Sequence, residues 1–297
     1  MNDVDRQAQS EHPRPNPRSP GLPSALLDEV VDQEPLTGGA ANEVWRVTLA
    51  GGTRHVLKRS AGVTDRFVSE ADGLRALHDL GGLLTPRVVE VSARHLLLES
   101  MHPAPPDAAG FWAAAGRAVA GLHAIKVTRF GWPVDGWLGL LPQENAWTED
   151  GHEFFAIHRI RRYLREPKVQ DALDVGDFAG LERICERLPL LVPSAPSVLN
   201  HGDLYQGNVV ATASGEPVFI DPAVCWTWAE SDLSMMYCTG RPPQAFFAAY
   251  QEISPLADGW RERMPLLHLR ELLSVVAHFG ARDDYVARIR KVIRRFS

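Results

Sequence analysis

The sequence predicts an α+β protein with two lobes: a small antiparallel sheet with one helix, followed by a larger and mostly helical part. Two observations predict this division. Short apolar runs separated by glycine turns fill the chain up to Met101, and Ala-rich stretches with the apolar spacing of helices follow it. The chain has 297 residues, 45% of them hydrophobic, which is enough for a substantial core.

The first lobe is predicted to span residues 21–101. It follows a tail, residues 1–20, which is rich in Pro and polar residues and which we expect to be disordered. A helix is expected over residues 65–80, because apolar residues there share one face and Gly81-Gly82 can end it. The predicted strands cover residues 43–49, 54–58, 86–91 and 96–99.

The second lobe is predicted to span residues 102–297. Its Ala-rich segments are expected to be helices that pack closely. The predicted helices cover residues 111–125, 154–164, 178–188, 243–253 and 265–279. Near the C-terminus, Arg and Lys alternate with apolar residues, which is typical of the solvated face of an amphipathic helix rather than of a nucleic-acid-binding arm.

The most informative stretch runs from His201 to Asn208 and is followed by a short apolar strand that ends at Asp221. An Asp, an Asn five positions later and a second Asp after a strand form the residue set that a phosphoryl-transfer site needs. Asp203 would meet the attacking hydroxyl, whereas Asn208 and Asp221 would hold Mg²⁺ against the phosphates of a nucleotide. His201 is expected to be structural, because Mg²⁺ prefers oxygen ligands.

The two strands around this site are expected to form a hairpin. If Ser214-Gly215 is a two-residue turn, Asn208 lies directly opposite Asp221. Side chains that face each other across two strands lie about 4.5–5.5 Å apart at Cβ, which suits a shared cation. A longer turn or a bulge would shift this register.

A nucleotide site is predicted on the first lobe. Lys58 ends a predicted strand and Glu70 lies on the helix that follows. In kinase-like folds a strand Lys grips the phosphates and pairs with a helix Glu. Gly38 and Gly39 lie in a turn-rich loop and would let backbone N–H groups approach the phosphates.

The boundary between the two lobes is expected to be the adenine-binding hinge. Glu99 and Met101 lie at this change in composition. Their backbone amide and carbonyl groups would meet the adenine ring. ATP and Mg²⁺ are therefore the expected nucleotide and metal.

Composition restricts the partners and the compartment. The formal net charge is −6, which does not favour nucleic acid, and no apolar run reaches the length of a membrane span. The N-terminus lacks the apolar segment of a signal peptide, and three cysteines form neither a disulfide framework nor a zinc site. We expect a cytoplasmic protein. The oligomeric state is left open.

With these residues in place, the chain resembles the fructosamine kinase (ketosamine kinase) family, within the wider group of aminoglycoside-phosphotransferase-like and choline-kinase-like enzymes. The resemblance covers about residue 36 to the C-terminus. Three blocks carry it: the His201–Asn208 loop, the Ile220–Leu233 segment, and a more specific block between Phe130 and Arg159. This last block is not needed for generic phosphoryl transfer.

The resemblance implies ATP-dependent, Mg²⁺-assisted phosphorylation of the sugar 3-hydroxyl of a ketosamine, either a small molecule or protein-bound, followed by release of the amine. It implies that Asp203 is the base, that Asn208 and Asp221 bind the metal, and that Glu70 orders Lys58. Deglycation would be the biological outcome.

Two departures from the family pattern fall on the acceptor side. Tyr205 stands where the family usually has Trp, and Trp226 lies in a segment where the family more often has two aromatic residues and Gly. Both are candidate substrate contacts. A fructosamine, a ribulosamine or another small-molecule acceptor, such as an aminoglycoside or choline, therefore remains open. A non-catalytic ATP-binding module is the alternative from a different class.

Overall fold

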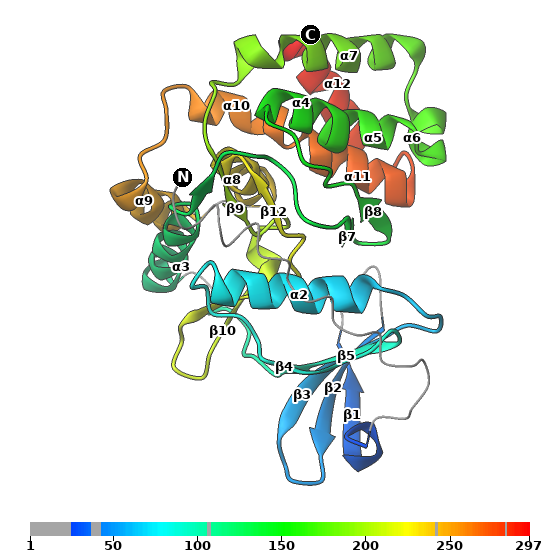
Figure 1. Cartoon of the computed structure of the whole chain (residues 1–297), viewed down its shortest axis with the longest axis vertical. Coiled ribbons are helices and arrows are strands. Elements are labelled where there is room, and N and C mark those ends of the chain that lie inside the picture. Colours follow the sequence, from blue (N-terminus) through cyan, green and yellow to red (C-terminus); the bar gives the residue numbers. More distant parts are fainter. Residues whose placement is uncertain (1–24, 37–42, 106–107, 241–242, 283) are drawn as a thin grey trace.

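The computed structural model describes residues 25–36, 43–105, 108–240, 243–282 and 284–297. It has two lobes, as the sequence predicts (Figure 1). The predicted disordered tail and the loop that carries Gly38 and Gly39 lie outside the described residues. The α+β assignment is confirmed: an antiparallel sheet forms the first lobe and helices dominate the second.

The first lobe is built on a five-stranded antiparallel sheet with strand order β1-β2-β3-β5-β4. Its strands are β1 (Val30–Pro35), β2 (Glu43–Leu49), β3 (Arg54–Arg59), β4 (Val88–Val91) and β5 (His95–Glu99). Four of them match the predicted strands. Strand β1 was not predicted, because five of its six residues are exposed and the chain there lacks the apolar alternation of a half-buried strand.

Helix α2 (Arg66–Asp79) lies between this sheet and the helical lobe (Figure 1). One face of α2 buries Phe67, Ala71 and Leu74 against the sheet residues Leu96 and Leu98. Such burial of apolar surface stabilises the first lobe.

The other side of α2 meets the second lobe. The guanidinium of Arg66 lies 5.9 Å from the centre of the Trp137 ring, on the hairpin of β7 (Gly136–Leu138) and β8 (Leu141–Gln143). A Cβ at Gly73 would lie 3.1 Å from Cγ of Pro222, so the second lobe approaches α2 closely there as well. Helix α2 is therefore held from both lobes.

The second lobe buries most of the core side chains. Its helices are α3 (Ala109–Leu122), α4 (Gly151–Phe155), α5 (Arg162–Leu164), α6 (Pro167–Ala172), α7 (Val175–Leu191), α8 (Ala229–Cys238), α9 (Gln244–Ile253), α10 (Trp260–Leu267), α11 (Leu269–Phe279) and α12 (Tyr285–Phe296). A π-helical segment, Ala156–Arg161, joins α4 to α5. The predicted helix 265–279 is in fact divided at His268 between α10 and α11.

Short strands position the loops of the second lobe. Strands β6 (Lys126–Val127), β9 (Ser197–Asn200) and β12 (Cys225–Thr227) form one small sheet, and β10 (Val209–Ala211) pairs with β11 (Pro217–Phe219). In the described part of the chain, no helix combines the length and apolar character that crossing a membrane requires.

Candidate active site

The loop from His201 to Asn208, here called the catalytic loop, connects β9 to β10 and is fixed by a buried carboxylate. Asp232 accepts hydrogen bonds from the backbone N–H groups of His201 at 2.6 Å and Gly202 at 2.8 Å, while His123 Nε2 lies 3.3 Å from it. Burial raises the pKa of Asp232, but the hydrogen bond from His123 and the other donors outweigh burial and hold it below its usual range. Asp232 thus braces the loop as an ionised group.

Gly202 is required by this geometry. Its φ is +83°, and a Cβ there would lie 1.9 Å from the carbonyl oxygen of Ala223. Only glycine permits such a close approach of two backbone segments. The two loops are also joined directly, because the N–H of Ala223 donates to the carbonyl of His201 at 2.9 Å.

Asp203 is held within this loop by hydrogen bonds to His201 and Asn208. Its N–H donates to Nδ1 of His201 at 3.2 Å, and Nδ2 of Asn208 donates to its Oδ2 at 2.9 Å and to its carbonyl oxygen at 2.8 Å. The structural role predicted for His201 is therefore confirmed. Burial raises the pKa of Asp203 to about 8, the negative charge of Glu271 adds to the rise, and the positive charge of Arg270 opposes it.

Lys58 and Glu70 meet as predicted, and Asp221 joins them. Lys58 Nζ donates to Oε1 of Glu70 at 2.6 Å and also donates to Oδ1 of Asp221. Burial lowers the pKa of Lys58, but the charges of Asp221 and Glu70 outweigh burial and raise it above its usual value. Burial raises the pKa of Glu70 to about 7, although the charge of Lys58 acts in the opposite direction.

The predicted hairpin register is wrong by one residue. Val209 pairs with Phe219 and Ala211 with Pro217, and the N–H of Ile220 donates to the carbonyl of Asn208 at 3.1 Å. Asn208 therefore faces Ile220, not Asp221. The turn has three residues, 213–215, and ends in Gly215 with a φ of +86°, which is typical of a three-residue hairpin.

The side chain of Asp221 still reaches Lys58, because the backbone of Asp221 adopts a left-handed conformation. Its φ is +56°, and among the described residues it is the only non-glycine residue with a positive φ. Asp and Asn tolerate this left-handed conformation better than most residues do. The charge of Asp221 also contributes to the raised pKa of Asp203, so the two carboxylates lie close enough to interact.

These residues fit a magnesium ion. Nδ2 of Asn208 is used by Asp203, which leaves its oxygen for a cation, and the side chain of Asp221 is 42% exposed. Within the described ranges, no cluster of three or more His, Cys, Asp or Glu residues could hold a metal. Magnesium does not need one, because it usually binds one or two protein oxygens together with waters and substrate phosphates.

The predicted hinge residues end the first lobe. Glu99 is the exposed last residue of β5, and its N–H donates to the carbonyl of Arg87 at 3.0 Å. Met101 is half-buried, and the next residue, His102, exchanges backbone hydrogen bonds of 2.8 and 2.9 Å with Ala211 on β10. The segment after β5 is thus tied directly to the β10–β11 hairpin, and its role as a hinge that contacts adenine stays a prediction.

The two predicted acceptor residues differ in their surroundings. Tyr205 is half-buried; burial and the negative charges of Asp203 and Asp221 raise the pKa of its hydroxyl. Trp226 is only 6% exposed, its backbone pairs with Gly131, and its ring centre lies 6.2 Å from that of Trp132. The structure gives Trp226 a packing role, and substrate contact by either residue stays a prediction.

Sequence reasoning missed Arg270 and Glu271, two buried charges behind the catalytic loop. They form an ion pair on α11, and Arg270 donates to the carbonyl of Gly202 at 2.6 Å. Both residues lie within a segment that was predicted only as a helix. The one available signal was their charge on a helix whose other residues are mainly apolar.

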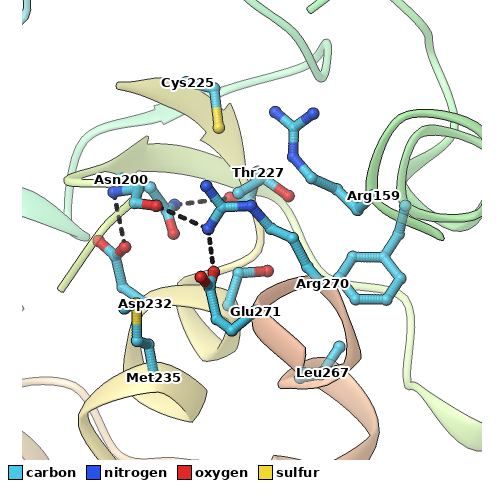
Figure 2. Close-up of a pocket in the computed structure, with 12 residues that line it drawn as sticks. Arg159, Asn200, Cys225, Thr227, Asp232, Met235, Leu267, Arg270 and Glu271 are labelled. Atoms are coloured by element: carbon cyan, nitrogen blue, oxygen red, sulfur yellow. Dashed lines mark hydrogen bonds and ion pairs between the residues drawn. The ribbon is translucent and has the colours of Figure 1, made fainter. Parts of the chain in front are cut away.

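A small cavity of about 10 Å³ lies beside this pair (Figure 2). Side-chain atoms of residues that line it have no hydrogen-bond partner among the described residues: Asn200 Oδ1, Thr227 Oγ1, Ser231 Oγ and Arg270 Nε. Buried polar atoms without partners are rare, and a cavity of this size can hold one water molecule.

We predict that a crystal structure at high resolution will show an ordered water bonded to at least two of these atoms. A dry cavity would contradict this prediction.

The raised pKa values also predict how stability depends on pH in the nucleotide-free protein. Asp203 and Glu70 bind protons more tightly in the folded state than in the unfolded state, so the contribution of these two groups to stability is full below about pH 4 and is lost as pH rises toward 8. We expect the melting temperature of Asp203→Asn to vary less over this range than that of the wild type. Parallel curves for the two proteins, measured without Mg²⁺, would contradict this prediction.

Comparisons with known proteins identify the fold and the family. A choline kinase from Streptococcus pneumoniae superposes with a TM-score of 0.60 at 14% identity, over 90% of this chain and 94% of that one. The fold is therefore that of the kinase-like enzymes.

Further comparisons identify the family to which the chain belongs. The model of the fructosamine kinase family matches residues 25–296, and the chain belongs to this family. A probable ketoamine kinase from Enterococcus faecium is 31% identical over 88% of this chain and 94% of its own length. A Thermobifida fusca protein assigned to the fructosamine-3-kinases superposes with a TM-score of 0.80 at 32% identity, over 92% of this chain and 100% of that one. A chloroplastic protein-ribulosamine 3-kinase from Oryza sativa subsp. indica is 29% identical over 87% of this chain and 81% of its own length.

Proposed function

We propose that this protein transfers the γ-phosphoryl group of ATP to a sugar hydroxyl of a ketosamine, with Mg²⁺ as the metal. Membership of the fructosamine kinase family supports the substrate class. The observation that carries the proposal is the assembly of the Lys58–Glu70 pair, Asp221 and the braced Asp203 around one site.

Asp203 is proposed as the base that accepts the proton of the attacking hydroxyl. Asn208 donates a hydrogen bond to its carboxylate, and the side chain of His201 accepts one from its backbone N–H. A base with a pKa near the working pH is effective, and burial raises that of Asp203 to about 8. The charge of Asp221 is one cause of this rise. A cation bound at Asp221 would therefore lower the pKa of Asp203 toward neutral pH.

Lys58 is proposed to grip the phosphates of ATP. Its ammonium stays charged, and Glu70 would keep it in position if Asp221 held the metal. Asn208 and Asp221 would hold Mg²⁺, which would neutralise charge that develops on the transferred phosphoryl group.

The remaining parts of the nucleotide site are proposed from the sequence pattern. Residues 21–101 would form the nucleotide-binding lobe and residues 102–297 the acceptor-binding lobe, with Glu99 and Met101 at the adenine. Gly38 and Gly39 would approach the phosphates.

Tyr205 is proposed to line the acceptor site, because it lies in the same loop as Asp203 and the negative charges of Asp203 and Asp221 act on its hydroxyl. The three cysteines Cys185, Cys225 and Cys238 are free, which fits a reducing cytoplasm.

The experiment that tests this function is ATP consumption with Mg²⁺ in the presence of one of four acceptors: a small fructosamine, a ribulosamine, an aminoglycoside or choline. We expect phosphorylation of a ketosamine alone, with product identified by mass spectrometry. Turnover of an aminoglycoside or choline, but of no ketosamine, would retain the phosphotransfer site and overturn the substrate class. Tight binding of Mg-ATP without turnover of any acceptor would favour a non-catalytic binding module.

A further inference from the structure

The buried side chain of Arg270 contacts the backbone of the catalytic loop. It projects from α11, and the residue is 9% exposed. Its Nη1 donates to the carbonyl of Gly202 at 2.6 Å and to Glu271, and its Nη2 donates to Oε1 of Gln143 at 2.7 Å. Figure 2 shows the guanidinium between the catalytic loop and Glu271. The rigid fork of an Arg side chain suits such simultaneous contacts.

Gln143 extends this contact to the second loop of the site. It ends β8, is only 2% exposed, and its Nε2 donates to the carbonyl of Ala223 at 2.9 Å. Its oxygen accepts from Arg270 at the same time. The two side chains thus form an unbroken series of hydrogen bonds between the carbonyls of Gly202 and Ala223, here called the Gln143–Arg270 link.

The ends of the link lie next to the two carboxylates of the site. Gly202 precedes Asp203, and Ala223 follows Asp221 by two residues. Glutamine is suited to the middle position, because its amide offers an acceptor to Arg270 and a donor to Ala223. Charge in the buried link is balanced, since Glu271 pairs with Arg270.

We propose that Gln143 and Arg270 are positioning residues that fix the Asp203 loop relative to the Asp221 loop. This inference rests on the proposed function, because the two loops must act on one reacting phosphoryl group. Misplacement of reacting groups by about 1 Å can lower a rate about 100-fold. The link touches neither Lys58 nor Glu70, and Asp221 keeps its own contact with Lys58 when the link is broken, so the link should set the rate of transfer rather than the affinity for ATP.

The test begins with Gln143→Met, which keeps the side-chain length and removes both hydrogen bonds. We expect kcat to fall about 10–100-fold, while KM for Mg-ATP stays within about twofold. Gln143→Asn, which retains an amide that is one methylene shorter, serves as a second variant if the first folds poorly. Gln251→Met is the matched control, because Gln251 also donates to a backbone carbonyl, that of Phe247 at 3.1 Å, but lies on α9 away from the site.

Coupling between the two residues is the second part of the test. Arg270→Lys keeps the charge beside Glu271 but loses the fork that reaches both acceptors. If the residues act as one link, the double variant Gln143→Met/Arg270→Lys should lose no more activity than the more damaged single variant. Independent losses that multiply would contradict a shared role.

Hydrogen exchange keeps this inference separate from the proposed function. In Gln143→Met we expect the backbone N–H groups of residues 201–204, 221, 223 and 224 to exchange at least about tenfold faster than in the wild type, with no such change in the Gln251→Met control. This holds whether or not the wild type phosphorylates a ketosamine. Unchanged exchange in these loops, a kcat within about twofold of the wild type, or a loss confined to KM for ATP would each overturn the inference.

Discussion

Replacing Asp203 with Asn is expected to lower kcat about 1,000-fold and to leave Mg-ATP affinity nearly unchanged. Removal of a positioned general base typically lowers a rate 100- to 10,000-fold. The amide oxygen of an Asn at position 203 can still accept the hydrogen bond from Asn208, so the loop should keep its shape. Lys58 and Asp221 lie on other segments and remain available to the nucleotide.

The measurement is steady-state turnover of the ketosamine, together with calorimetric titration of Mg-ATP. Asp171→Asn is the matched control, because Asp171 is exposed on α6 and should tolerate the same chemical change. If Asp203→Asn retains turnover within about threefold of the wild type, Asp203 is not the base.

Replacing Asp221 with Ala is expected to abolish the part of nucleotide affinity that depends on Mg²⁺. In the wild type we expect ATP to bind at least about tenfold more tightly with Mg²⁺ than with a chelator, because the metal joins the protein carboxylate to the phosphates. In the variant this ratio should approach one. Lys58 should still pair with Glu70 and supply the remaining affinity.

The conformation of Asp221 calls for a second variant. Alanine tolerates the φ of +56° less well than Asp does, so Asp221→Ala can also lose stability. Asp221→Asn accepts the same backbone shape and removes only the charge. If both variants keep the full response to Mg²⁺, Asp221 does not bind the metal.

The sequence predicts the chemistry better than it predicts the geometry. The residues Lys58, Glu70, Asp203 and Asn208 are identifiable because phosphoryl transfer requires particular side chains at particular spacings. The structure pairs Lys58 with Glu70 as expected, whereas the contact of Asn208 with Asp203 was not predicted. Element types were equally accessible wherever apolar residues recur with a clear period, as in α2 and α3.

What could not be predicted depends on single backbone angles or on distant contacts. The hairpin register depends on whether the turn has two or three residues, and a change of one moves Asn208 from Asp221 to Ile220. Strand β1 lies at the edge of the sheet, and five of its six residues are exposed, so its sequence has no apolar periodicity. The link between Gln143 and Arg270 joins residues 127 positions apart, and nothing in the sequence indicates that they meet.

The way α2 is held has a consequence for control of the enzyme. In many kinases the corresponding Lys–Glu pair forms only after an activating event moves the helix. Here the second lobe contacts α2 at Arg66 and at Gly73, on either side of Glu70, and the Lys58–Glu70 pair is formed. Because both lobes hold α2, we expect flux through this protein to follow its abundance and the supply of its substrates rather than an on–off switch in the helix.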